Sequence, residues 1–214
     1  MNTVLILGGT FDPVHNAHLR TASDVAELLG VEQIRLLPCG EPAHREQPAA
    51  TTAQRLAMLQ CAVHEQPRFV IDTQELARNG PSYMVDTAAN LRRELGAECC
   101  ICLMMGMDAF LGLPAWHEWS KIPELINLVV VERPGWQGAL KQQRALQQLL
   151  EQRQVSTVEA LLAAPAGKIW MVKVSQLPLS ATQIRNMISA GESPQGLLPE
   201  SVLALIREQK IYQN

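Results

Sequence analysis

Residues 4–18 read Val4-Leu5-Ile6-Leu7-Gly8-Gly9-Thr10-Phe11-Asp12-Pro13-Val14-His15-Asn16-Ala17-His18. The apolar run at the start predicts a β-strand, and the pattern from about Asn16 onward predicts a helix. Paired glycines at the end of a strand let the backbone turn tightly and come close to a ligand. The following helix points its N-terminal amides and the positive end of its dipole at the same place, which favours phosphate. The stretch therefore predicts a phosphate-binding turn.

Two histidines, His15 and His18, lie three residues apart at the expected start of this helix. That spacing places both on one face, beside the same phosphate group. Each imidazole offers N–H donors and can carry charge near neutral pH. The alternative is that both are surface or capping residues, but their position after a strand and a glycine pair favours the phosphate role. The Gly-x-x-x-x-Gly-Lys-Ser/Thr and Gly-x-Gly-x-x-Gly patterns are missing, which argues against a P-loop and against a hydride-transferring enzyme.

Short apolar runs alternate with helical patterns along the chain. Several of these runs are apolar throughout, as is typical of parallel strands covered on both faces. Alternating strands and helices with short connections predict an α/β fold with a Rossmann-like, doubly wound parallel sheet. The expected strands are Val4–Leu7, Ile34–Leu37, Phe69–Ile71, Cys100–Met105, Leu128–Val131 and Ile169–Val174.

The expected helices have recognisable ends. The helical spacing from Leu19 to Leu29 is followed by Gly30, which is placed to end that helix. Thr51 and Gln54 make a capping box. Since there is no internal repeat and no low-complexity linker, residues 1–214 are expected to form one domain, with 175–214 a C-terminal helical part packed on it. Further helices are expected from near Ser82, within Leu140–Leu162, and over Ala181–Ala190 and Pro199–Gln209.

Charge and composition limit the possible partners and compartments. The net charge of −3 gives no general reason to bind nucleic acid or an anionic membrane, so local groups have to hold an anionic substrate. No apolar stretch has the length of a transmembrane helix or a signal peptide. The five cysteines favour a reducing, cytoplasmic setting over a disulfide framework. The spacing of Cys99, Cys100 and Cys102 fits no common zinc pattern, so no metal held by the protein is expected.

The quoted stretch resembles the signature of the nucleotidyltransferase superfamily, and more narrowly that of bacterial nicotinate-nucleotide adenylyltransferases. The resemblance extends over nearly the whole chain. It implies that ATP and nicotinate mononucleotide react to give deamido-NAD and pyrophosphate, with Mg²⁺ bound together with ATP. It also implies that His15 and His18 are catalytic and that the residues of the turn bind ATP, namely Gly8, Gly9, Thr10 and Phe11.

A second segment resembles the family's Ile-Ser-x-Thr-x-Ile-Arg signature, and it reads Leu179-Ser180-Ala181-Thr182-Gln183-Ile184-Arg185. Ser180 is a favourable N-cap, and Arg185 lies one turn in, where it can form charge-assisted hydrogen bonds to the β- or γ-phosphate. A capped surface helix with a solvated arginine is the alternative, and the first signature argues against it. The resemblance implies a catalytic Arg185 and ATP binding by Ser180 and Thr182.

Two more segments resemble the family's nucleotide-binding segments. The first, Gly106-Met107-Asp108, follows an expected buried strand, and the resemblance implies that Gly106 and Asp108 contact the adenosine of ATP. Asp108 is also suited to cap the next helix. The second runs from Pro114 to Trp119, and the resemblance implies that Trp116 stacks on the nicotinate ring. Trp119 is expected to be a core residue.

Three further residues are placed by the resemblance alone. Tyr83 and Arg133 are expected at the nicotinate mononucleotide, and Arg45 at the phosphates of ATP. His44, which precedes Arg45, is either a phosphate ligand or an ordinary loop residue.

The chain departs from the family pattern at two positions. Ala17 stands where the family usually has Gly, so a methyl group narrows the approach of a ligand. Met84 stands where the family often has Thr, which removes a hydroxyl beside the nicotinate carboxylate. The preference for nicotinate over nicotinamide mononucleotide is therefore left open.

Two other functions stay open at this point. One is another superfamily activity, such as that of a pantetheine-phosphate adenylyltransferase or a cytidylyltransferase. The former usually has Thr at the position of His15, and neither needs the segment around Trp116. The other is a nucleotide-binding regulator without turnover, against which the intact His18 and Arg185 argue. The oligomeric state is not set by the sequence.

Overall fold

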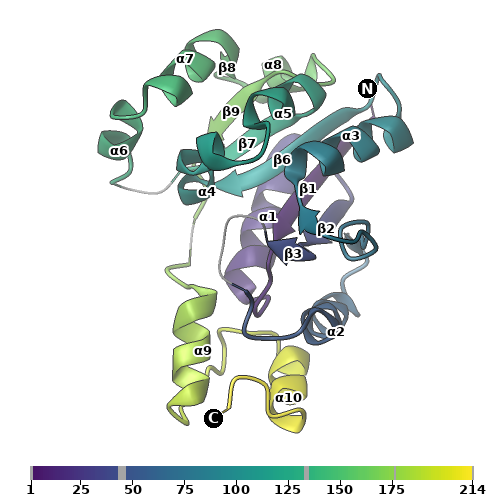
Figure 1. Ribbon diagram of the computed structural model, residues 1–214, viewed down its shortest axis with the longest axis vertical. Helices are drawn as coiled ribbons and strands as arrows, with labels where there is room; N and C mark the ends of the chain where they lie inside the picture. The colour runs from purple at the N-terminus through teal and green to yellow at the C-terminus, as the bar shows by residue number, and fades with distance from the viewer. Residues whose placement is uncertain (1, 43–46, 133–134, 176, 214) are drawn as a thin grey trace.

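The computed structural model describes residues 2–42, 47–132, 135–175 and 177–213. Within them, seven parallel strands form one sheet in the order β4-β2-β1-β6-β7-β9-β8 (Figure 1). This order and the helices on both faces confirm the Rossmann-like, doubly wound α/β prediction. The strands are β1 Thr3–Gly9, β2 Ile34–Pro38, β4 Phe69–Ile71, β6 Cys100–Gly106, β7 Asn127–Val131, β8 Gln154–Val155 and β9 Ile169–Val172.

The predicted helix ends at Gly30 and Thr51 are confirmed. Gly30 adopts φ 65°, the left-handed conformation that ends helices, and Thr51 accepts a hydrogen bond from the Gln54 backbone N–H at 3.2 Å. The α-helices are α1 Asn16–Leu29, α2 Thr52–Val63, α3 Met84–Leu95, α4 Met107–Leu111, α5 Ile122–Leu125, α6 Gln137–Lys141, α7 Arg144–Arg153, α8 Val158–Leu162, α9 Ala181–Ser189 and α10 Glu200–Glu208. Short 3₁₀ turns cover Leu113–Ala115 and Trp119–Lys121.

The structure differs from the prediction in three places. The stretch from Leu140 to Leu162 is not uniformly helical, because β8 interrupts it by pairing with β9 at the edge of the sheet. A pairing partner distant in sequence thus overrides the helical composition. The helix expected near Ser82 begins at Met84, since residues before it form β5 (Pro81–Ser82), which pairs with β3 (Glu41–Pro42). The last predicted strand ends at Val172, two residues earlier than expected.

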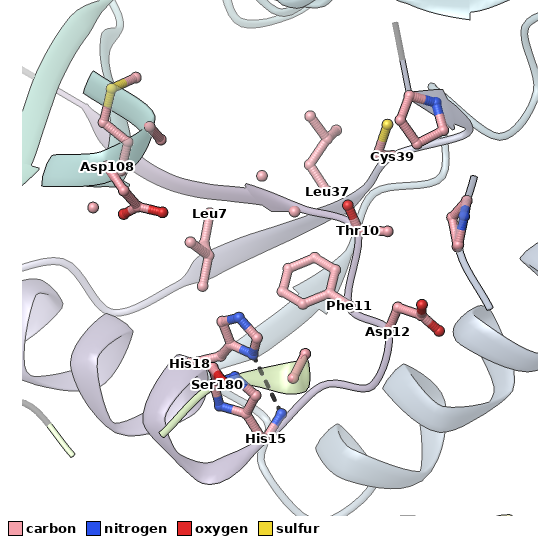
Figure 2. Close-up of a pocket in the computed structure, with 18 of the residues that line it drawn as sticks. Leu7, Thr10, Phe11, Asp12, His15, His18, Leu37, Cys39, Asp108 and Ser180 are labelled. Carbon is pink, nitrogen blue, oxygen red and sulfur yellow. Dashed lines mark hydrogen bonds between the residues drawn. The ribbon is translucent and has the colours of Figure 1, made fainter. Parts of the chain in front are cut away.

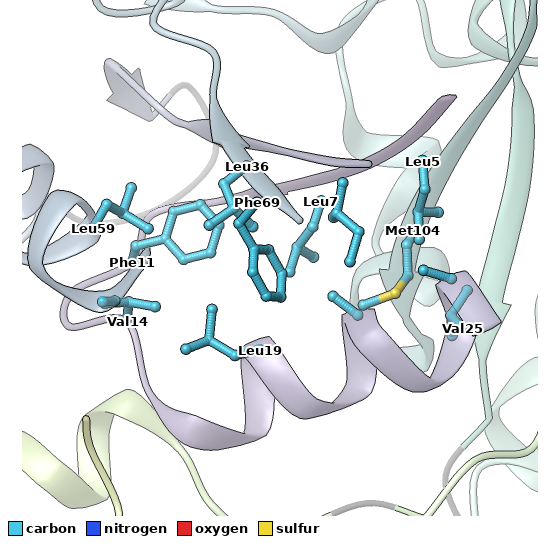
Figure 3. Packing of buried hydrophobic residues seen from close by; sticks show 14 of the residues in the cluster. Leu5, Leu7, Phe11, Val14, Leu19, Val25, Leu36, Leu59, Phe69 and Met104 are labelled. Atoms are coloured by element: carbon cyan, nitrogen blue, oxygen red, sulfur yellow. The ribbon is translucent and has the colours of Figure 1, made fainter. Parts of the chain in front are cut away.

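Alternate residues of the strands face opposite sides of the sheet and build two separate cores. The first core contains Leu5 and Leu7 of β1 together with the buried faces of α1, α2, α9 and α10 (Figure 3). The second core contains Ile6 together with the buried faces of α3, α4, α5 and α7. Nearly continuous apolar strands are what burial on both faces requires.

The last two helices extend the first core. Ile184 and Ile188 of α9 and Val202 and Ile206 of α10 are buried in it, and α10 packs against α2. Figure 1 shows α9 and α10 together at the end of the molecule beyond α1 and α2. This packing brings the far end of the sequence close to the segment that follows β1. In the described part of the chain, no helix has the length and apolarity needed to span a membrane.

Candidate active site

The central strands β1 and β6 separate at their carboxyl ends. Their pairing runs as far as Leu7 and Met104, whereas β1 stays paired with β2 up to Gly9 and β6 stays paired with β7 up to Gly106. The helices that follow them, α1 and α4, pack on opposite faces of the sheet. Ligands of open parallel sheets bind at such a point. A cavity of about 880 Å³ lies there, within the range of small-molecule sites.

The cavity gathers most of the residues assigned from the sequence. Residues from both signatures and from the segments around Asp108 and Trp116 contribute to its wall. Two assigned arginines, Arg45 and Arg133, lie outside the described residues, as does His44. The assigned residues that line the cavity are Gly8, Gly9, Thr10, Phe11, His15, His18, Gly106, Asp108, Trp116, Ser180, Thr182 and Arg185.

The two histidines form a stacked pair at the start of α1. Their ring centroids lie 3.6 Å apart with an angle of 19° between the ring planes. His15 is the N-cap residue of α1, and its backbone N–H donates a hydrogen bond of 3.3 Å to Nδ1 of His18 (Figure 2). Phe11 touches His18 edge-on, with centroids 5.3 Å apart. The His18 ring is therefore fixed on two sides before any substrate arrives.

The bond to Nδ1 decides what His18 can offer a ligand. Because Nδ1 accepts a hydrogen bond, the proton of the neutral ring lies on Nε2, which then acts as a donor. Burial, followed by the nearby charge of His15, lowers the pKa of His18 well below its ordinary value. His18 is therefore a neutral donor at pH 7 in the absence of ligand. A bound phosphate would favour the charged form.

The lowered pKa of His18 predicts a pH-dependent stability. The unfolded chain takes up a proton at His18 below about pH 6.5, whereas the folded chain does so only at lower pH. The free energy of unfolding should therefore fall as pH drops below that value. From about pH 7.5 to about pH 5.5, the loss should be smaller in His18→Gln than in the parent chain, by at most about 1.4 kcal/mol. Urea unfolding at the two pH values measures it, and equal losses in both proteins would contradict the assignment.

Phe11 belongs both to the cavity wall and to the first core. Its side chain is only 2 % exposed and packs near Val14 and Leu59 (Figure 3), and its backbone has φ 50°. A Cβ on Gly9 would lie 3.3 Å from the Phe11 ring, so glycine lets the backbone of the turn pack closely against this ring. The sequence assigned Phe11 to ATP binding. The structure adds that its ring supports the turn and the histidine pair.

Arg185 joins the second signature to the first. Its Nη1 donates a hydrogen bond of 2.7 Å to the backbone carbonyl of Asp12 and lies 3.7 Å from the Asp12 carboxylate. Its Nη2 donates to Oγ1 of Thr182 at 3.3 Å. Ser180 caps α9 as predicted, since its hydroxyl accepts from the Gln183 backbone N–H at 3.2 Å. The guanidinium is therefore anchored beside the turn that carries the histidines.

Two residues that hold this turn were not identified from the sequence. The carboxylate of Asp12 accepts hydrogen bonds from the backbone N–H groups of Ala49 and Ala50, at 2.8 and 3.0 Å. The buried guanidinium of Arg55 donates to the carbonyls of Thr10 and Cys39, both at 2.8 Å, and so ties the ends of β1 and β2 together. Asp12 lies inside the first signature, and this position could have identified it as part of the site. Nothing in the sequence of α2 distinguishes Arg55 from a solvated arginine.

Gly106 and Asp108 form the wall at the end of β6. Gly106 is the N-cap residue of α4, and Asp108 is an exposed residue of its first turn. The alternative that Asp108 caps the helix is therefore wrong. A Cβ on Gly106 would lie 2.8 Å from Oδ1 of Asp108, so glycine lets the carboxylate keep this position over the end of the strand.

An aromatic side chain also lines the cavity. Trp116 is half-buried and lines the wall next to His117. Tyr83 does not line the described part of the cavity. It packs against His117, with ring centroids 4.3 Å apart, so its placement at the mononucleotide stays a prediction. Trp119 packs against the second core but is only half-buried, so it is less buried than the predicted core residue.

The cavity wall also includes a buried carboxylate that was not identified from the sequence. Glu75 is 4 % exposed, accepts a hydrogen bond of 2.8 Å from Oγ1 of Thr87, and lies 3.8 Å from the guanidinium of Arg78. Burial raises the pKa of Glu75. Met84 and Ala17 both line the cavity, so both departures from the family pattern lie at its wall.

Comparisons with known proteins agree with this geometry. The chain matches the cytidylyltransferase-like family over residues 6–187. It is 45 % identical to a probable nicotinate-nucleotide adenylyltransferase of Methylococcus capsulatus, over 97 % of this chain and 98 % of the relative. It is 44 % identical to a protein of the same name from Cellvibrio japonicus, over 99 % of both chains.

The fold has a solved counterpart. The structure of Plasmodium falciparum nicotinic acid mononucleotide adenylyltransferase complexed with NaAD superimposes with a TM-score of 0.72. That match covers 99 % of this chain and 98 % of the other at 15 % sequence identity, so it bears on the fold alone. The full-length identity to the bacterial relatives shows more: the chain belongs to the nicotinate-nucleotide adenylyltransferase family of cytidylyltransferase-like nucleotidyltransferases.

Proposed function

We propose that this chain transfers the adenylyl group of ATP to nicotinate mononucleotide, giving deamido-NAD and pyrophosphate in NAD biosynthesis. The observation that carries the proposal is the convergence of His15, His18 and Arg185 on one cavity where β1 and β6 separate. Three groups that can donate to phosphate come there from two ends of the sequence. The aromatic side chain of Trp116 lines the same cavity.

The reaction needs positioning more than covalent help from the protein. A phosphate oxygen of the mononucleotide attacks the α-phosphorus of ATP, a new P–O bond forms, and the bond to the β-phosphate oxygen breaks as pyrophosphate leaves. Negative charge moves onto the leaving group in this step. Donors held in place beforehand stabilise that charge without having to reorganise. His18 offers Nε2–H, and the anchored Arg185 offers its remaining N–H groups.

The two substrates are assigned to the two ends of the cavity. The adenosine of ATP lies by Gly106 and Asp108, and its triphosphate crosses the turn toward Ser180 and Arg185. The pyridine ring of the mononucleotide stacks on Trp116. Mg²⁺ enters as part of the substrate, bound to the phosphates of ATP, since this ion prefers phosphate and water oxygens. The surplus of donors around the phosphates explains how a chain of net charge −3 can hold two anionic substrates.

The choice of acceptor is tested by measuring pyrophosphate release from ATP with three acceptors in turn. Nicotinate mononucleotide should support the fastest release, nicotinamide mononucleotide slower release, and phosphopantetheine none above background. Fastest release with phosphopantetheine would favour the related superfamily activity. Silence with all three acceptors, in a sample that still binds ATP, would favour a nucleotide-binding regulator.

Trp116→Ala should weaken the acceptor selectively. Stacking of an aromatic side chain on a ring of this kind contributes about 1–3 kcal/mol, so KM for nicotinate mononucleotide should rise roughly 5- to 150-fold. KM for ATP should change little, because Trp116 belongs to neither of the two signatures assigned to ATP. Steady-state kinetics with each substrate varied in turn measures both values. Trp119→Phe, which changes an indole packed on the second core, serves as the matched control and should leave both KM values near those of the parent.

A further inference from the structure

The segment after α10 turns back toward the cavity, although no residue in it belongs to either signature. Ile211 is buried in the first core, and its neighbours Lys210 and Tyr212 have φ 51° and 63°. Bulky side chains rarely take this left-handed conformation, and they keep it only where surrounding contacts enforce it. At this position, the contact that holds the backbone is made by the side chain of Tyr212.

The hydroxyl of Tyr212 reaches the residue that anchors Arg185. It donates a hydrogen bond of 2.7 Å to Oδ1 of Asp12 and lies 4.0 Å from the sulfur of Met58. Burial, followed by the bond to Asp12, raises the pKa of Tyr212 far above its ordinary value, so the hydroxyl stays protonated and keeps donating. The hydrogen bond joins residues 200 positions apart in the sequence.

Asp12 needs this donor because its carboxylate is 6 % exposed and lies beside a site for phosphate. Two backbone N–H groups and the Tyr212 hydroxyl donate hydrogen bonds to the carboxylate oxygens of Asp12. A buried carboxylate satisfied in this way can stay in place and orient its own backbone carbonyl. That carbonyl accepts the 2.7 Å bond from Nη1 of Arg185, which leaves Nη2 toward Thr182 and the cavity.

We propose that Tyr212 is a positioning residue for ATP: through Asp12 it fixes the guanidinium of Arg185 at the triphosphate. This inference rests on the proposed function only for the identity of the nucleotide. It adds a residue from outside the cavity wall to the working parts of the site. It also gives the helical segment after β9 a second task besides covering the first core.

The test compares Tyr212→Phe with Ser201→Ala. Tyr212→Phe keeps the ring that packs on the first core and removes only the hydroxyl. Ser201→Ala removes the 3.0 Å hydrogen bond from α10 to the Cys61 carbonyl, which holds the same helix without contacting Asp12. Equilibrium binding of ATP is measured without acceptor, and KM for each substrate is measured with nicotinate mononucleotide. Tyr212→Phe should weaken ATP binding and raise KM for ATP about tenfold, with KM for the mononucleotide unchanged. Ser201→Ala should change neither.

A second comparison separates positioning from general stability. In an Arg185→Lys background, Tyr212→Phe should weaken ATP binding by less than about twofold, because the group it positions is already lost. An equal loss of ATP affinity in both backgrounds would overturn the proposal, as would ATP binding in Tyr212→Phe that matches Ser201→Ala. Should Tyr212→Phe not fold, Asp12→Asn probes the same link, and unchanged ATP affinity there would also overturn it. A wild-type chain that binds ATP but does not turn over nicotinate mononucleotide would count against the proposed function and leave this binding test intact.

Discussion

His18→Ala should lower kcat about 10²–10³-fold at saturating ATP, the loss typical of removing one prearranged donor from a developing negative charge. The His18 ring is held by the His15 backbone, by the stacked His15 ring and by Phe11, so its Nε2–H needs no rearrangement as pyrophosphate leaves. A group that acts mainly in the transition state affects kcat more than KM. The KM for ATP should therefore change by a smaller factor than kcat.

Pyrophosphate release under single-turnover and steady-state conditions measures this effect. His64→Ala is the control, because it removes an imidazole at the end of α2, outside the cavity wall, and should keep the parent kcat. His18→Gln should recover part of the loss, since an amide can still donate to phosphate. If His18→Ala turned over at a near-normal rate with saturating ATP, His18 would not be a catalytic residue.

Arg185→Ala should lower kcat/KM for ATP by roughly 10²–10³-fold, because it removes both a charge and a directed donor from the triphosphate. Arg185→Lys should recover only part of this loss. A lysine carries one compact ammonium group, which cannot bond the Asp12 carbonyl, Thr182 and a phosphate with the fixed geometry of a guanidinium. The KM for nicotinate mononucleotide should stay within about threefold of the parent value, since a distant contact mainly affects its own ligand.

Kinetics with ATP varied at saturating mononucleotide gives the first value, and the reverse experiment gives the second. Arg207→Ala is the matched control. Arg207 lies on α10 and donates to the hydroxyl of Ser193 at 3.1 Å, away from the cavity. Its loss should leave both constants unchanged. Equal losses in the two arginine variants would show that stability, and not contact with ATP, is being measured.

Local pattern was enough to predict the sheet apart from its edge strand β8, together with the positions of both signatures. The strand that ends at Gly9 and the cap at Ser180 are each encoded by a few adjacent residues, so their elements could be identified before their neighbours were known. The convergence of both signatures at one sheet edge follows from a general rule of parallel sheets.

The supports of the site could not be predicted in the same way. Arg55 reads as an ordinary helix residue, and it is buried only because the ends of β1 and β2 present their carbonyls to it. Tyr212 reads as a residue beyond the last helix, and its role depends on how α10 packs against α2. The packing of Tyr83 on the ring of His117 was likewise not predicted, because the two residues are far apart in the sequence. Contacts between segments far apart in sequence leave no periodic signal.

The position of Phe11 sets a limit on making this protein more heat-resistant. Its ring is packed into the first core and touches His18 at the same time, so a change in that core is transmitted to the donor. Enlarged or reshaped side chains next to Phe11, at Val14 or Leu59, should move the imidazole of His18. A gain in melting temperature from such a change should therefore come with a lower turnover rate. The second core has no such contact with His18 among the described residues. A redesign for durability should therefore begin on the face of the sheet covered by α3 and α7.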